Sequence, residues 1–171
     1  MAQIVLVTGG VRSGKSRFAL SLAVPPRLFV ATASPNDHEM RRRIEIHQAD
    51  REGDWDLLES PLLPALELSF SLGQRKYNWV VIDCVTLWVS NMVLRGWSRS
   101  DVLQRVEEVL EVVGGTEVNA VLVSSEVGMG LVPPYPLGRL YRDLLGEVNG
   151  LVSTHASSVY LMVAGNPLRV K

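Results

Sequence analysis

The chain is poor in cysteine, with Cys84 as the single one among 171 residues. A disulfide within the chain is therefore impossible, which suits a reducing compartment such as the cytosol. An excess of charge of one sign is missing as well, since 17 Lys and Arg side chains stand against 18 Asp and Glu side chains. The net charge of −1 indicates neither nucleic acid nor a membrane surface as a partner.

Long hydrophobic runs, internal repeats and low-complexity tracts are also missing. No run is long enough to span a membrane. The first apolar run, residues 4–8, is only as long as a strand and has no charged residue before it, so we expect no signal peptide. Because 47% of the residues are hydrophobic, the chain can bury a substantial core, and we expect one cytoplasmic domain over residues 1–171.

A glycine-rich segment follows that first apolar run and precedes a helical pattern. Its spacing, G-x-x-x-x-G-K-[ST], is typical of the phosphate-binding P-loop. Its residues are Gly9, Gly10, Val11, Arg12, Ser13, Gly14, Lys15 and Ser16. A chance glycine turn is the alternative, but a strand pattern before the loop and a helix pattern after it favour a P-loop. We therefore predict that the chain binds a nucleoside triphosphate, with Lys15 on the β- and γ-phosphates and Ser16 as a ligand of Mg²⁺.

Another apolar strand pattern, residues 77–83, ends in a carboxylate. This is the form of a Walker B segment, which makes Asp83 a second candidate ligand of Mg²⁺. Cys84 occupies the place where many hydrolytic ATPases carry a water-activating glutamate, so that pattern is incomplete here. A simple cap at the end of the strand is the alternative role for Asp83.

A strongly basic helix is predicted over about residues 38–51. Arg43, His47 and Arg51 are spaced i, i+4 and i+8, so they share one face. Composition alone favours a solvated basic helix with one incidental histidine. The alternative is a histidine that the two guanidinium groups keep neutral, and therefore nucleophilic, beside a phosphate that the same cations stabilise.

The other patterns alternate between strands and helices. Strands are expected at residues 27–32, 53–59, 117–124 and 159–164, and the tail can add a short one. Helices are expected after Asp83, from Ser98 or Ser100 to about 113, and over 137–156. A further helix is expected from Pro61 to Gly73, capped by Ser60, with Leu62, Leu63, Leu66 and Phe70 as its apolar face.

This alternation predicts an α/β fold of the P-loop NTPase type: three layers, with a mainly parallel central sheet and helices on both faces. The long loop at residues 125–136 leaves the carboxyl end of a strand. In an open parallel sheet that edge binds ligands, although an ordinary surface loop is an equally good interpretation.

Several of these segments together resemble the family of adenosylcobinamide kinase / adenosylcobinamide-phosphate guanylyltransferase. They are residues 9–17, 31–33, 37–40, 43–44, 47, 51, 55, 83–91, 125–133 and 142–149. The resemblance covers essentially the whole chain. It implies phosphorylation of the hydroxyl of adenosylcobinamide by GTP or ATP, and then GMP transfer from GTP to adenosylcobinamide phosphate. The products are adenosylcobinamide-GDP and pyrophosphate, and the family also forms trimers.

The resemblance also assigns roles to residues. It makes His47 the nucleophile that carries the guanylyl group, and it places nucleotide contacts at Ala31, Thr32, Ala33, Gln48, Ala49, Asp50, Arg51, Glu59 and Asp83. Glu59 and Asp83 would accept hydrogen bonds from guanine, so Asp83 has two candidate roles, as guanine reader and as metal ligand. Some relatives carry tandem histidines, but Ile46 precedes His47 here. A small-molecule kinase without guanylyl transfer and a non-enzymatic GTP-binding protein are the alternatives.

Overall fold

The computed structural model describes residues 2–34, 55–74 and 76–171. The predicted basic helix with Arg43, His47 and Arg51, and the predicted nucleotide contacts at residues 48–50, lie outside the described residues.

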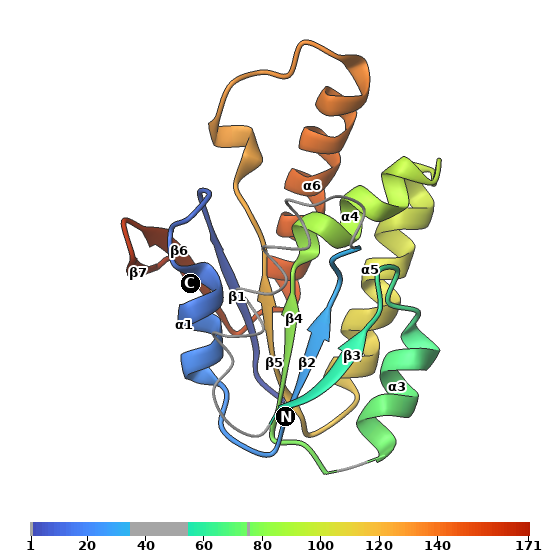
Figure 1. The fold of residues 1–171 in the computed structure, drawn as a ribbon, viewed down its shortest axis with the longest axis vertical. Helices are drawn as coiled ribbons and strands as arrows, with labels where there is room; N and C mark the ends of the chain where they lie inside the picture. The colour runs from blue at the N-terminus through green and yellow to red at the C-terminus, as the bar shows by residue number, and fades with distance from the viewer. Residues whose placement is uncertain (1, 35–54, 75) are drawn as a thin grey trace.

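Among the described residues, seven strands form one sheet in the order β3-β2-β4-β5-β1-β6-β7 (Figure 1). Every neighbouring pair is parallel except β6 and β7, which are antiparallel. The strands are β1 Ile4–Gly9, β2 Arg27–Ala31, β3 Trp55–Glu59, β4 Trp79–Asp83, β5 Asn119–Val123, β6 Ser158–Val163 and β7 Asn166–Arg169. The predicted parallel sheet and the short C-terminal strand are confirmed.

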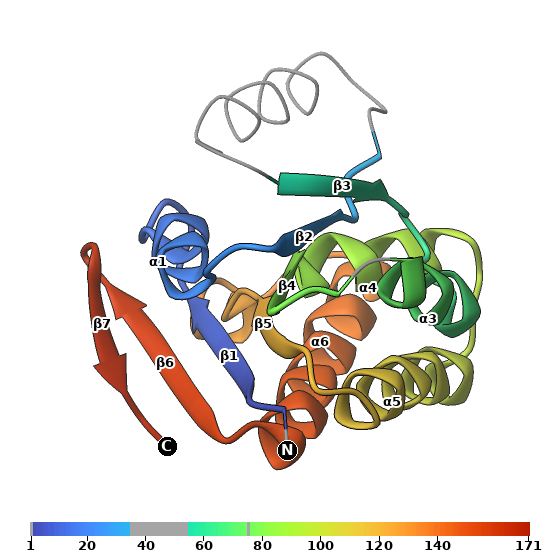
Figure 2. The same cartoon turned by 90° about the horizontal axis from the view of Figure 1, so that it is seen from below.

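Helices cover both faces of the sheet, as predicted (Figure 2). They are α1 Lys15–Leu22, α3 Ala65–Gln74, α4 Val85–Leu94, α5 Arg99–Gly114, the 3₁₀ turn η1 Val127–Met129 and α6 Pro136–His155. Helices α3 to α6 lie together on one face, and α1 lies on the other. No helix in the described part of the chain has both the length and the hydrophobicity needed to cross a membrane.

The central strands are buried on both faces. In β1, Ile4 and Leu6 belong to the core under α3 to α6, while Val5 and Val7 belong to the smaller core under α1. This is why the strand reads as a continuous apolar run rather than an alternating one. Helix α5 begins with a reciprocal capping box between Ser98 and Asp101, which decides between the two caps that the sequence allowed.

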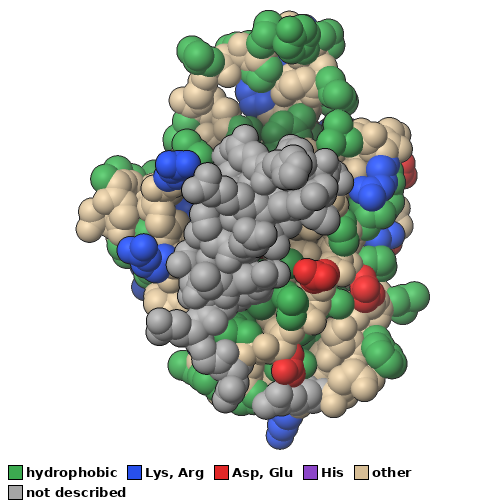
Figure 3. Space-filling view, in the orientation of Figure 1, with side chains coloured by type: hydrophobic (Ala, Val, Ile, Leu, Met, Phe, Trp, Pro, Cys, Tyr) green, Lys and Arg blue, Asp and Glu red, His purple; other side chains and the backbone are tan. Residues whose placement is uncertain are grey.

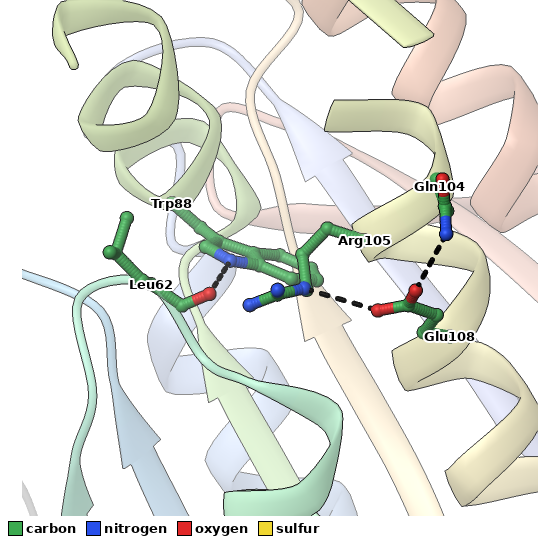
Figure 4. Close-up of polar contacts among 5 residues, drawn as sticks. All are labelled: Leu62, Trp88, Gln104, Arg105 and Glu108. Carbon is green, nitrogen blue, oxygen red and sulfur yellow. Dashed lines mark hydrogen bonds and ion pairs between the residues drawn. The ribbon is translucent and has the colours of Figure 1, made fainter. Parts of the chain in front are cut away.

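The predicted helix from Pro61 to Gly73 is wrong at its start. Helix α3 begins at Ala65, and Ser60 instead accepts a hydrogen bond from the Leu63 amide at 3.1 Å. A residue before proline is driven away from the helical conformation. Leu63, which precedes Pro64, lies outside that conformation, with a φ of 42°. The indole N–H of Trp88 donates to the Leu62 carbonyl oxygen at 2.8 Å and holds this loop against α4 (Figure 4).

The apolar face predicted for this helix is wrong for the same reason. Leu66 is 85% exposed and Phe70 is 70% exposed, whereas Leu68 and Leu72 are buried. Because the loop 60–64 interrupts the helix, the predicted spacing through Leu62 and Leu63 does not continue along one helical face. Helix α6 shows a related difference, since Leu140 is half exposed while Leu144 and Leu145 are buried. Its first turns extend beyond the sheet (Figure 1).

A matched pair of leucines tests the corrected face of α3. We expect Leu68→Ala to lower the free energy of unfolding by about 2–5 kcal/mol, because it opens a cavity at a fully buried position. Leu66→Ala, the same chemical change in the same helix, should change it by less than about 0.5 kcal/mol. Urea unfolding followed by circular dichroism measures both, and equal losses would contradict this assignment of the buried face.

Candidate active site at the carboxyl edge of the sheet

The register of the parallel strands brings several predicted residues to one row. Ala31 pairs with Glu59 on one side and with Asp83 on the other, and Asp83 pairs with Val123. Val7 of β1 also pairs with Val123, so the P-loop begins just beyond the same row. Neighbouring strands lie about 4.8 Å apart, so this row and the P-loop form one continuous edge.

The P-loop runs from the end of β1 to the start of α1, as predicted. Gly9 has a φ of 145°, and a Cβ there would lie 2.7 Å from the backbone oxygen of Met162 in β6. Gly14 caps α1 in the left-handed conformation, with a φ of 90°. Both positions therefore require glycine for a physical reason, backbone crowding at Gly9 and a left-handed turn at both.

Hydrogen bonds from three elements hold the loop in its curve. The Ser13 hydroxyl donates to the Gly10 carbonyl oxygen at 2.8 Å. The Gly165 amide, in the turn between β6 and β7, donates to the Ser13 carbonyl oxygen at 3.2 Å. The Lys15 ammonium donates to the Gly10 oxygen at 2.5 Å, so its charge lies over the loop.

Lys15 lies close enough to Asp83 and Cys84 to interact with them electrostatically. Burial lowers the pKa of Lys15, and the negative charges available to Cys84 and Asp83 oppose that shift. The lysine of the loop and the carboxylate at the end of β4 therefore lie within electrostatic range of each other. Strand β5 separates β1 from β4, so the carboxylate reaches the loop across one intervening strand.

Cys84 follows Asp83 and is chemically inert as an acid or base. Burial, reinforced by Asp83, raises the pKa of its thiol to about 12. The thiol is therefore neutral at physiological pH, and it cannot replace the carboxylate that many ATPases carry at this place.

Thr32 supports this strand end with every polar group it has. Its amide donates to the backbone carbonyl oxygen of Asp83 at 3.2 Å, and its own carbonyl oxygen accepts from the side-chain amide of Asn91 at 2.8 Å. Its hydroxyl donates to the backbone carbonyl oxygen of Cys84 at 2.7 Å and accepts from the backbone amide of Cys84 at 2.8 Å. Since Thr32 is also fully buried, its role in this structure is to tie the end of β2 to the end of β4.

The remaining predicted contacts in the described chain lie along the same edge. Ala33 and Ser16 are partly exposed, and Glu59 is exposed at the end of β3. In the described chain, no group of three or more His, Cys, Asp and Glu side chains is arranged to hold a metal ion. The structure thus brings together the P-loop, Asp83 and the 31–33 segment.

Sequence reasoning missed a polar network beside the P-loop. The Thr8 hydroxyl donates to Oε1 of Glu126 at 2.7 Å, and the Asn149 amide group lies 3.4 Å from the same oxygen. Asn149 also donates to the Ser125 oxygen at 3.1 Å and accepts from the Ser124 hydroxyl at 2.6 Å. The available signal was a polar residue at the end of each buried strand, Thr8 near the end of β1, before Gly9, and Ser124 directly after β5.

The fold and the loop together define a P-loop nucleotide-binding protein. A solved KaiC-like protein from Pyrococcus horikoshii has a similar fold, with a TM-score of 0.56 over 93% of this chain and 70% of that one. The two sequences are 16% identical, so this likeness concerns the fold alone.

Sequence comparison narrows the class to one family. Residues 5–170 match the family of cobinamide kinase / cobinamide phosphate guanyltransferase, and the chain belongs to it. It is 38% identical to the bifunctional adenosylcobalamin biosynthesis protein CobP of Pseudomonas aeruginosa, over 97% of this chain and 96% of that protein. It is 32% and 30% identical to the proteins named CobU of Escherichia coli and Salmonella typhimurium, over 98% of this chain and 99% of each relative. The predicted family and its enzymatic class are confirmed.

The crowding at Gly9 gives a test of the loop geometry. Gly9→Ala should lower the free energy of unfolding by about 1–3 kcal/mol, because it combines a disfavoured φ with a clash against β6. Gly10→Ala is the matched control, since a Cβ there meets nothing within 4 Å. Thermal unfolding without nucleotide measures both variants, and a Gly9→Ala protein as stable as Gly10→Ala would contradict the described contact.

Proposed function

We propose that this chain phosphorylates the hydroxyl of adenosylcobinamide and then joins GMP to the new phosphate. A nucleoside triphosphate supplies the first phosphoryl group, and GTP supplies GMP with release of pyrophosphate. The observation that carries the proposal is the P-loop, with Lys15 beside Asp83, in a chain that belongs to the cobinamide kinase family along its whole length.

The triphosphate would bind at the loop formed by Gly9 to Ser16. The amides at the start of α1 and the positive end of that helix face the loop, which is the arrangement that stabilises phosphate oxygens. The ammonium of Lys15 already lies over the loop at Gly10, so a small movement would bring it to the β- and γ-phosphates. Its charge would offset the negative charge that develops during transfer.

The donor set at this end of the loop fits Mg²⁺. The Ser16 hydroxyl and the Asp83 carboxylate are oxygen ligands of the kind Mg²⁺ prefers, and phosphate and water would supply the remaining ligands. When bound, the ion neutralises charge on the phosphates. Asp83 interacts with Lys15, which supports its place at the phosphate end of the site.

The nucleotide base would lie along the row formed by Glu59, Ala31 and Asp83. Glu59, the carboxylate at the end of β3, is a suitable acceptor for the N1–H and amino group of guanine, and Asp83 is the alternative acceptor if it does not bind Mg²⁺. Ala33 follows on the same edge, with Thr32 holding the strand ends together. By family resemblance, Gln48, Ala49, Asp50 and Arg51 would complete the nucleotide contacts.

GMP transfer would use His47 as a covalent carrier. A ring nitrogen attacks the α-phosphorus of GTP, an N–P bond forms, and the bond to the β-phosphate oxygen breaks to release pyrophosphate. An oxygen of adenosylcobinamide phosphate then attacks the same phosphorus, the N–P bond breaks, and adenosylcobinamide-GDP forms. A nitrogen nucleophile thus divides one difficult transfer into two displacements.

We propose that the protein works in the cytoplasm as a trimer, which family resemblance supports.

Replacing Lys15 tests the phosphoryl transfer step. Lys15→Ala should lower phosphorylation of adenosylcobinamide by about 100-fold or more, because it removes the cation that meets the developing charge. The assay follows conversion of the corrinoid by liquid chromatography. Lys76→Ala, which removes an exposed lysine before β4, is the control and should retain activity. Full activity of Lys15→Ala would contradict the role of the loop.

Replacing His47 tests the covalent carrier. With GTP labelled at the α-phosphate, the wild-type chain should acquire a label that is stable to base and labile to acid, as a phosphoramidate is. His47→Ala should acquire none. His155→Ala is the control, since His155 lies at the end of α6, 3.0 Å from Glu107, and should not affect labelling. A label that survives in His47→Ala would exclude this mechanism.

A further inference from the structure

Glu126 is held to the end of β1 through both its backbone and its side chain. Its amide donates to the Gly9 carbonyl oxygen at 3.2 Å, at the first residue of the P-loop. Its Oε1 accepts from the Thr8 hydroxyl at 2.7 Å and lies 3.4 Å from the Asn149 amide group. Backbone and side chain are therefore both fixed at the carboxyl end of β1.

The groups that hold Glu126 are themselves buried. Thr8 is 5% exposed and Asn149 is 7% exposed. The Asn149 amide is oriented by Ser124 and Ser125, so its NH₂ group must point toward the carboxylate. A donor from β1 and a donor from α6 thus converge on one oxygen, which fixes the orientation of the carboxylate.

The second carboxylate oxygen has no partner within the described part of the chain. Across residues 2–34, 55–74 and 76–171, no hydrogen-bond donor reaches Oε2 of Glu126, and the residue is partly exposed. A carboxylate with one oxygen anchored and the other accessible, beside a phosphate-binding loop, has the form expected of a general base.

We propose that Glu126 is the general base of the kinase step. Its Oε2 takes the proton from the substrate hydroxyl while the alcohol oxygen attacks the γ-phosphorus. The new O–P bond forms, the bond between the γ-phosphorus and the bridging oxygen breaks, and the nucleoside diphosphate leaves. The proton passes from Glu126 to solvent after product release. This inference rests on the proposed function, since it needs an alcohol acceptor and a triphosphate donor.

The surface after Glu126 suits a large apolar acceptor. The chain continues through η1 into exposed apolar side chains, and Figure 3 shows hydrophobic side chains gathered over this loop and the first turns of α6. Met129 is 76% exposed, Leu131 is 95% exposed and Tyr135 is 76% exposed. A substrate whose ring rests on this surface could extend its hydroxyl toward Glu126, which lies at the base of the loop.

Glu126→Gln tests the proposal, because glutamine keeps the size and the Oε1 acceptor but cannot take a proton. We expect the kinase kcat to fall at least 100-fold with little change in KM for adenosylcobinamide. The second reaction, tested with adenosylcobinamide phosphate and GTP, has no hydroxyl to deprotonate. The factor by which its kcat falls should therefore be at least 30 times smaller than the factor for the kinase step. Glu111→Gln, the same change at an exposed position of α5, is the matched control for the kinase assay.

The outcomes separate the two levels of the proposal. A wild-type chain that does not phosphorylate adenosylcobinamide would overturn the proposed function itself. An active wild type with a kinase kcat in Glu126→Gln within tenfold of normal would overturn only the role of Glu126. If Glu126→Gln does not fold, Glu126→Asp decides. A loss confined to the kinase step supports the general base, and an equal loss in both reactions contradicts it.

Discussion

The parallel register of the sheet is the constraint on which the rest of the structure depends. Strands β3, β2, β4 and β5 align Glu59, Ala31, Asp83 and Val123 in one row, and β1 delivers the P-loop just beyond it. Residues far apart in sequence therefore meet at one edge without needing contacts of their own. A one-residue slip of any strand would move every such side chain to the opposite face of the sheet.

Buried polar groups keep that edge in place. Thr32 ties β2 to β4, Asn91 reaches the same point from α4, and Asn149 links α6 to β5. Buried polar groups are costly unless they are paired, so these networks are stable only in the native arrangement. They hold the strand ends that carry Asp83 and Glu126 in defined positions at this edge of the sheet.

Much of the fold was predictable, because local patterns determine it. Local patterns identified β1 from the apolar run before Gly9, the start of α1 from the P-loop spacing, and α5 from its periodicity. Two things were not visible. Helix α3 begins only at Ala65, because Leu63 before Pro64 has a positive φ, and the apolar spacing did not reveal this. The Glu126 network joins residues 118 positions apart, and only the register of β1 against β5 brings them together. The contacts of His47 stay a prediction.

The central claim is that one chain carries out two successive transfers on the same corrinoid. The most direct measurement is a time course, by mass spectrometry, of adenosylcobinamide incubated with the wild-type chain, Mg²⁺ and GTP. We predict that adenosylcobinamide phosphate appears first and then declines as adenosylcobinamide-GDP forms with one equivalent of pyrophosphate. A corrinoid that never gains a phosphate, or a GDP derivative that forms without the phosphate intermediate, would contradict the account.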